Sequence, residues 1–88
     1  MDVLDKSFES AVEIVNNLKQ KPTNEELLQL YGLFKQSNLG DNNTTKPAFI
    51  DFKGCKKWDA WESLKGKSQN ESKQEYITLA MNLFKNYG

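Results

Sequence analysis

The sequence predicts an all-α domain of four helices, and three observations carry this prediction. Apolar residues recur every three to four positions in four separate segments, which is the period of an amphipathic helix. Two of these segments open with the Ser/Thr-x-x-Glu pattern of a capping box. No run alternates apolar and polar residues long enough to demand a strand. With 88 residues, the chain is expected to form one domain over residues 1–88.

The first two helices are predicted from apolar residues at helical spacing and from a proline that separates the two segments. An apolar stripe runs from Leu4 to Leu18 and stops near Pro22, which lacks an amide donor and restricts the residue before it. Thr23 and Glu26 have the spacing of a capping box and open the second helix. Its stripe consists of Leu27, Leu30, Tyr31 and Phe34.

The second half of the chain is predicted to hold a long loop and two helices. Residues 38–51 are rich in Gly, Asn, Thr and Pro and have little helical period, so they are expected to form the loop. Asp51 is the expected N-cap of the third helix, and Gly66 its stop. Ser68 and Glu71 form the second capping-box pattern. The stripe of the fourth helix consists of Tyr76, Ala80, Leu83 and Tyr87, flanked by Ile77, Met81 and Phe84.

Composition excludes several classes of function. The 12 basic residues, all lysine, balance 12 acidic ones, which argues against a protein whose main partner is nucleic acid. Without histidine and with one thiol, Cys55, neither catalysis nor a metal site is expected. A single cysteine favours a reducing compartment, and the acidic N-terminal stretch resembles neither a leader nor a membrane span. We therefore expect a soluble, cytoplasmic protein without a cofactor.

Two short patterns combine rings with positive charge. Tyr31, Phe34 and Lys35 share one helical face, and Lys53 and Lys57 are one turn apart in the third helix. A ring stacks on a purine and an ammonium neutralises a phosphate, so the constellation suits a nucleotide. The alternative is that the rings, including the Trp58 and Trp61 pair, belong to the core and the lysines to a solvated face.

The stretch "YGLFKQSNLGDNNTTKPAFIDFKGCKKWDAWESLKGKS", with the downstream "YI", closely resembles the signature region of the acyl-CoA-binding protein family. The resemblance extends back through Phe8 and "LKQKPTNEE" and covers nearly the whole chain. It implies an up-down-down-up four-helix bundle that carries medium- to long-chain fatty acyl-CoA and catalyses nothing. It also implies a monomer with transient contacts to acyl-CoA-using enzymes and membranes.

The resemblance further implies roles for individual residues. Tyr31, Lys35 and Lys57 match positions that hold the 3′-phosphate of coenzyme A, and Phe34 and Tyr76 match positions that flank the adenine. The tryptophans match a structural pair, which favours the core alternative. The complete set of implied ligand-binding positions is Asn16, Leu27, Leu28, Tyr31, Gly32, Leu33, Phe34, Lys35, Lys53, Lys57 and Tyr76.

This chain differs from the family at two implied binding positions. The family usually has tyrosine where this chain has Phe34, so a phenolic hydrogen bond is missing. The family often has lysine where this chain has Asn16, so a positive charge is missing. The acyl tail is expected over Leu27 and Leu28, next to the start of the third helix near Cys55.

Two rival functions stay open: an interaction module using the "KKWDAW" face, and a thioester-processing enzyme acting through Cys55.

Overall fold

The protein, seen in a computed structural model that describes residues 2–88, consists of four α-helices. They are α1 (Val3–Asn16), α2 (Asn24–Leu39), α3 (Phe52–Glu62) and α4 (Gln69–Tyr87). All four predicted helices are present, and residues 2–88 contain no strand. The predicted all-α class is therefore confirmed.

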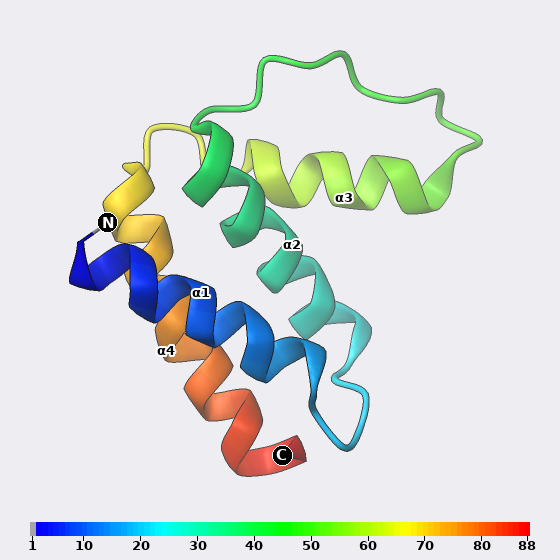
Figure 1. The fold of residues 1–88 in the computed structure, drawn as a ribbon. Coiled ribbons are helices and arrows are strands. Elements are labelled where there is room, and N and C mark those ends of the chain that lie inside the picture. The colour runs from blue at the N-terminus through cyan, green and yellow to red at the C-terminus, as the bar shows by residue number, and fades with distance from the viewer. Residues whose placement is uncertain (1) are drawn as a thin grey trace.

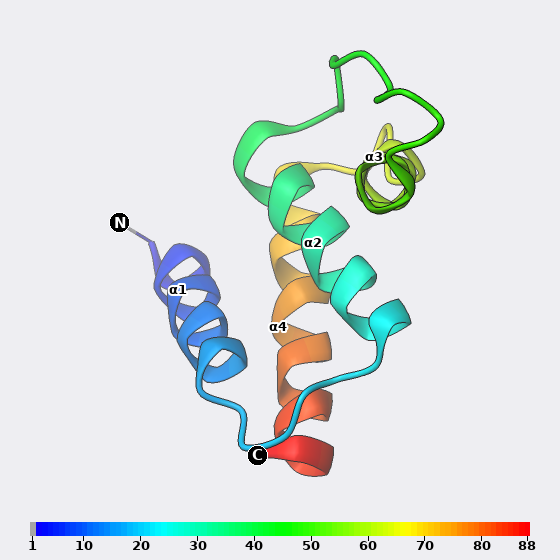
Figure 2. The same ribbon diagram turned by 90° about the vertical axis from the view of Figure 1, so that its right-hand side faces the viewer.

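The helices lie side by side in the order α1, α4, α2, α3. Helix α4 packs between α1 and α2, and α3 packs against α2 alone. Figure 1 shows α1 and α4 running in one direction and α2 in the other, while Figure 2 views α3 along its axis, across the other three. One face of α3 is consequently left for the long loop to cover.

The helix starts follow the predicted caps. Thr23 accepts from the Glu26 amide at 3.2 Å while the Glu26 carboxylate accepts from the Thr23 amide at 2.9 Å, so this capping box is complete. The second box is only half formed. The Ser68 hydroxyl accepts from the Glu71 amide at 3.0 Å, but it also donates to the Glu71 carboxylate, which therefore does not meet the Ser68 amide.

Two helix ends fall earlier than predicted. Helix α1 ends at Asn16, and Leu18 packs against the core from outside it. Helix α3 ends at Glu62 because its last amides tighten to i→i−3 bonds, such as Leu64 to the Trp61 carbonyl at 3.0 Å. Gly66, with φ of 92°, still ends the whole segment.

The core lies between α4 and the helices on either side of it. The stripe of α4 is its centre, with Ala80 and Leu83 fully buried. The members of the buried cluster are Phe8, Ala11, Leu30, Leu33, Tyr76, Ala80 and Leu83. Because α3 contributes none of them, it is held by α2 and by the loop.

The two tryptophans fasten the loop to α3. The Trp61 indole donates to the Gly40 carbonyl at 2.9 Å, and the Trp58 indole donates to the Thr44 carbonyl at 3.1 Å. Trp61 is one of the buried hydrophobic residues, whereas Trp58 is only half-buried. The prediction that both rings join α3 to the core is wrong for Trp58, because the face of α3 that carries it meets the loop.

A buried amide joins α2 to the two later connections. Gln36 is fully buried, and its Nε2 donates to Asp41 Oδ1 and to the Lys67 carbonyl, both at 2.8 Å. The Gly66 amide donates to the same Asp41 oxygen at 2.8 Å. These bonds, first that from Gly66 and then that from Gln36, lower the pKa of Asp41.

The unequal burial of the tryptophans predicts unequal costs of truncation. Trp61→Ala should lower the free energy of unfolding by about 3 to 5 kcal/mol. Trp58→Ala should lower it by about 1 to 2 kcal/mol, from one hydrogen bond and partial burial. Urea denaturation of both variants measures these losses. Equal losses would show that Trp58 is a core residue after all.

The Asp41 bonds predict a pH-dependent contribution to stability. A carboxylate whose folded pKa is lowered stabilises the fold above its unfolded pKa, and this stabilisation is lost as pH falls through the folded pKa. Asp41→Asn should therefore be less stable than the wild type at neutral pH. The difference should shrink below about pH 4. Denaturation at a series of pH values tests this, and a difference that persists unchanged in acid would contradict it.

Candidate ligand-binding site

The site begins where α2 and α3 cross at Gly32. A Cβ added to Gly32 would lie 2.6 Å from the Ala60 carbonyl oxygen and 3.0 Å from its carbon. The absence of a side chain thus lets the backbones approach closely. Gly32 is buried under α3, and its contribution to the site is this spacing.

At this crossing two ammonium groups lie close to the Tyr31 ring. Lys35, one turn further along α2, places Nζ 5.7 Å from the Tyr31 ring centroid. Lys57 places its Nζ 5.3 Å from the same centroid, from α3. Lys35 Nζ is also 5.7 Å from the Trp61 ring. Cation–π attraction of about 0.5 to 1 kcal/mol at such exposed contacts favours this clustering of like charges around the rings.

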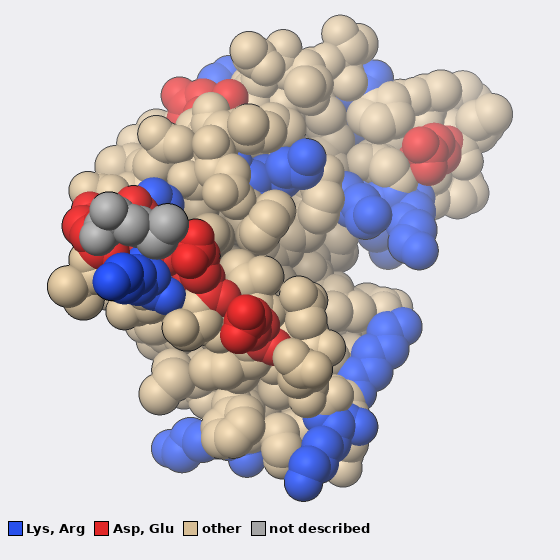
Figure 3. Space-filling model, viewed as in Figure 1, with Lys and Arg blue, Asp and Glu red and all other residues tan. Residues whose placement is uncertain are grey.

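The charges of this cluster are not neutralised by carboxylates. No ion pair within residues 2–88 includes Lys35, Lys53 or Lys57. Figure 3 shows lysine side chains gathered along the edge of α3 that faces α2, whereas acidic side chains lie over α1. A chain with zero net charge therefore presents a local positive surface, which can attract an anion.

An aromatic group lies beside the cluster, at the junction of α1, α2 and α4. Tyr76 packs edge-on against Phe8 with centroids 5.1 Å apart, and Phe34 lies 6.1 Å from Phe8 and 6.3 Å from Tyr76. Phe34 is 40% exposed and Tyr76 only 3%. Burial raises the pKa of Tyr76 to about 12, so its phenol is neutral at physiological pH. Phe34 supplies the accessible ring.

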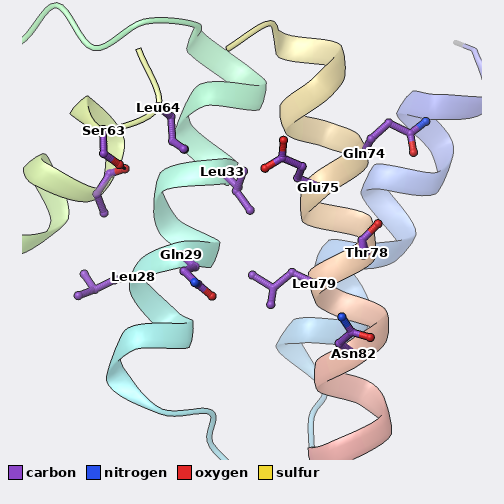
Figure 4. A pocket seen from close by; sticks show the side chains of 11 residues that line it. Leu28, Gln29, Leu33, Ser63, Leu64, Gln74, Glu75, Thr78, Leu79 and Asn82 are labelled. Atoms are coloured by element: carbon purple, nitrogen blue, oxygen red, sulfur yellow. Dashed lines mark hydrogen bonds between the residues drawn. The ribbon is translucent and has the colours of Figure 1, made fainter. Parts of the chain in front are cut away.

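The predicted leucines lie on different sides of α2. Leu27, one turn before Tyr31, is half-buried against the core. Leu28 and Leu33 line a pocket of about 570 Å³ between α2, the end of α3 and α4. Figure 4 shows Leu33 pointing into the space between α2 and α4. Because a helix turns about 100° per residue, Leu33 lies nearly opposite Tyr31 and away from the lysine cluster.

Three further residues are placed at the margins. Asn16 is the last residue of α1, whose main packing partner is α4. Lys53 is exposed one turn before Lys57. The Cys55 thiol donates to the carbonyls of Pro47 and Ala48 at 3.5 and 3.4 Å. It therefore faces the loop, whereas the sequence predicted that it would lie near the acyl tail over Leu27 and Leu28.

Sequence reasoning missed the scaffold that fixes the start of the loop. Gln36 and Asp41 cross-link α2 to the segment after α3, and Lys46 pairs with Asp59 of α3 at 3.0 Å. The available signal was a glutamine on the helix face between apolar positions, followed by the Gly-Asp pair that ends the helix. Nothing in that pattern identifies its partners.

The arrangement binds rather than reacts. Two unpaired ammonium groups and a phenol are chemically suited to hold an anion, and an exposed ring is suited to stack on a planar group. Residues 2–88 contain no cluster of three or more His, Cys, Asp or Glu side chains that could hold a metal. The indoles that the interaction-module hypothesis needs are bonded to the loop. Fold and site together define a small helical binding protein for an anionic ligand with a planar part.

Comparison with known proteins identifies the kind of binding protein. The family model for Acyl CoA binding protein matches residues 5–80. An acyl-CoA-binding protein homolog of Drosophila melanogaster is 46% identical over 85 residues, 97% of this chain and 99% of the relative. The acyl-CoA-binding protein of Saccharomyces cerevisiae is 48% identical over 80 residues, 91% of this chain and 92% of the relative.

Solved structures agree with the sequence match. The crystal structure of Oryza sativa acyl-CoA-binding protein 2 superimposes with a TM-score of 0.91 at 37% identity, covering 94% of this chain and 90% of that one. The solution structure of an acyl coenzyme A binding protein from yeast gives a TM-score of 0.73 at 48% identity, covering 91% of this chain and 93% of that one. The chain belongs to the acyl-CoA-binding protein family. Membership confirms the predicted resemblance and the prediction of a carrier and not an enzyme.

The close helix crossing predicts an unusual response to substitution. Gly→Ala inside a helix ordinarily stabilises it by about 1 kcal/mol. Gly32→Ala should instead destabilise the protein by about 1 to 3 kcal/mol, because the new methyl group meets the Ala60 backbone. It should also weaken ligand binding by moving Lys57 away from Tyr31. Thermal melting and calorimetry measure both effects, and a rise in stability would contradict the crossing.

Proposed function

We propose that this protein binds medium- to long-chain fatty acyl-CoA esters and carries them between the enzymes and membranes that use them. The observation that carries the proposal is the Tyr31 ring flanked by the unpaired ammonium groups of Lys35 and Lys57. An acyl-CoA ester combines a charged nucleotide with an apolar tail, so its carrier needs both kinds of surface.

The cluster serves the 3′-phosphate of coenzyme A. The two lysines approach this group from two different helices, and the Tyr31 hydroxyl adds a donor. Charge-assisted hydrogen bonds contribute about 1.5 to 3 kcal/mol each, before the costs of association. The head group therefore sets the class of ligand. Lys53, one turn away, extends the positive surface to the remaining phosphates.

The adenine stacks on the exposed face of Phe34. Tyr76 is almost fully buried behind Phe34 and supports its ring, since the two ring centroids are 6.3 Å apart. Phenylalanine provides stacking without a phenolic hydrogen bond, and Asn16 provides no charge in place of the lysine common in the family. Affinity here rests on the lysines of α2 and α3.

The tail lies along α2 over Leu27 and Leu28, the turn before Tyr31. Each methylene that leaves water contributes about 0.8 kcal/mol, close to fourfold in affinity. Chain-length preference therefore depends on how far this surface continues. A head group lying over the tail covers the thioester and protects it from water.

The cellular setting follows from the same properties. The family resemblance suggests a monomer without a cofactor, and the single cysteine favours the reducing cytoplasm. The zero net charge argues against a nucleic-acid partner. Its contacts with acyl-CoA-using enzymes and with membranes are transient, because a carrier must release its ligand.

Lys35→Ala tests the head-group site. The variant should bind palmitoyl-CoA at least about tenfold more weakly with its fold intact, because one ammonium contact to the phosphate is lost. Removing the 3′-phosphate from the ligand should weaken wild-type binding by a similar factor. The two losses should not add, because they remove one interaction.

Isothermal titration calorimetry measures these affinities. Lys6→Ala is the matched control, because Lys6 is an exposed lysine of α1 outside the cluster. Unchanged affinity in Lys35→Ala, or losses that add fully, would remove Lys35 from the phosphate site.

A further inference from the structure

The end of the long loop exposes three large apolar side chains within four residues. Phe49 is 83% exposed, Ile50 is 72% exposed and Phe52 is 73% exposed. They lie where the loop enters α3, at the right-hand tip of the molecule in Figure 1. Neither the core nor the proposed ligand site uses them.

The backbone beneath these side chains is fixed. The Asp51 amide donates to the Ala48 carbonyl at 2.9 Å, and the Cys55 thiol donates to the same carbonyl at 3.4 Å. Asp51 caps α3 by accepting from the Gly54 amide at 2.9 Å. The tip is therefore preorganised, and its exposed rings are not the result of a loose loop.

The surroundings of the tip are basic. Residues 47–58 contain Lys53, Lys56 and Lys57 and a single carboxylate, Asp51, which is engaged as the cap. Lys56 is one turn from Phe52 on the same face of α3. Figure 3 shows lysines along the lower edge of this largely uncharged tip.

We propose that this tip, residues 49–52 with Lys56, docks the protein on an anionic lipid surface. Separately projecting apolar side chains suit the bilayer interface, where each is buried among acyl chains, and Lys56 meets the phosphates of the headgroups. Docking is peripheral, since no helix within residues 2–88 has the length and apolarity to cross a membrane.

The biological reason for docking on a membrane rests on the proposed carrier function. Lys53 and Lys57 belong to the first turns of the helix that begins at the tip, so docking brings the ligand site to the membrane that supplies or accepts the acyl chain. The docking surface itself needs no bound ligand, and it can be measured without one.

Sedimentation of the ligand-free protein with vesicles of equal parts phosphatidylcholine and phosphatidylserine tests the proposal. A double variant, Phe49→Ser with Ile50→Ser, should partition to the vesicles at least about tenfold less than the wild type. Phe84→Ser is the matched control, because Phe84 is 55% exposed on α4, and it should sediment like the wild type. Calorimetry should show that the double variant still binds palmitoyl-CoA.

A charge arm tests the role of the headgroups. Lys56→Gln should lower partitioning about fivefold, and raised salt should lower it further. Wild-type protein that stays in the supernatant, or that sediments equally with the double variant, would overturn lipid docking. Equal partitioning to pure phosphatidylcholine vesicles would also overturn it. Because the vesicles carry no acyl-CoA, failure of the carrier proposal would leave this result intact.

Discussion

The close approach of α2 and α3 at Gly32 fixes the position of the candidate site. Within residues 2–88, α2 is the one helix against which α3 packs, so this crossing sets where the lysines of α3 lie. It brings Lys57 to within 5.3 Å of the Tyr31 ring centroid, although the two residues are far apart in the sequence. A larger residue at position 32 would separate the two halves of the positive cluster. The site is therefore a consequence of one missing side chain.

Helix α3 illustrates how a small domain uses one short element for two sets of contacts. The indoles of Trp58 and Trp61 donate to loop carbonyls, while Lys57, one turn before Trp61, places its ammonium group 5.3 Å from the Tyr31 ring centroid. Tryptophan suits the first task because it combines a large ring with a single donor that reaches a backbone carbonyl. Rings and charge are concentrated in one helix because it holds the loop and, in the proposed function, also binds an anion.

Local patterns predicted most of the fold because they act within a few residues. The Thr23 capping box and the stripe through Ala80 and Leu83 needed no tertiary information. The contacts of Gln36 and Trp58 could not be predicted, because each partner lies across the chain and the choice depends on how α3 crosses α2. Within the site, the spacing of Tyr31 and Lys35 followed from helical period, whereas the approach of Lys57 came only from family resemblance.

We propose that the cluster of Tyr31, Lys35 and Lys57 receives the head group of acyl-CoA. Titration of isotopically labelled protein with palmitoyl-CoA, followed residue by residue by NMR, provides the test. We expect the largest chemical-shift changes at these three residues and at Phe34. Large shifts confined to Thr78, Leu79 and Asn82, which line the pocket on the other side of α2, would contradict it.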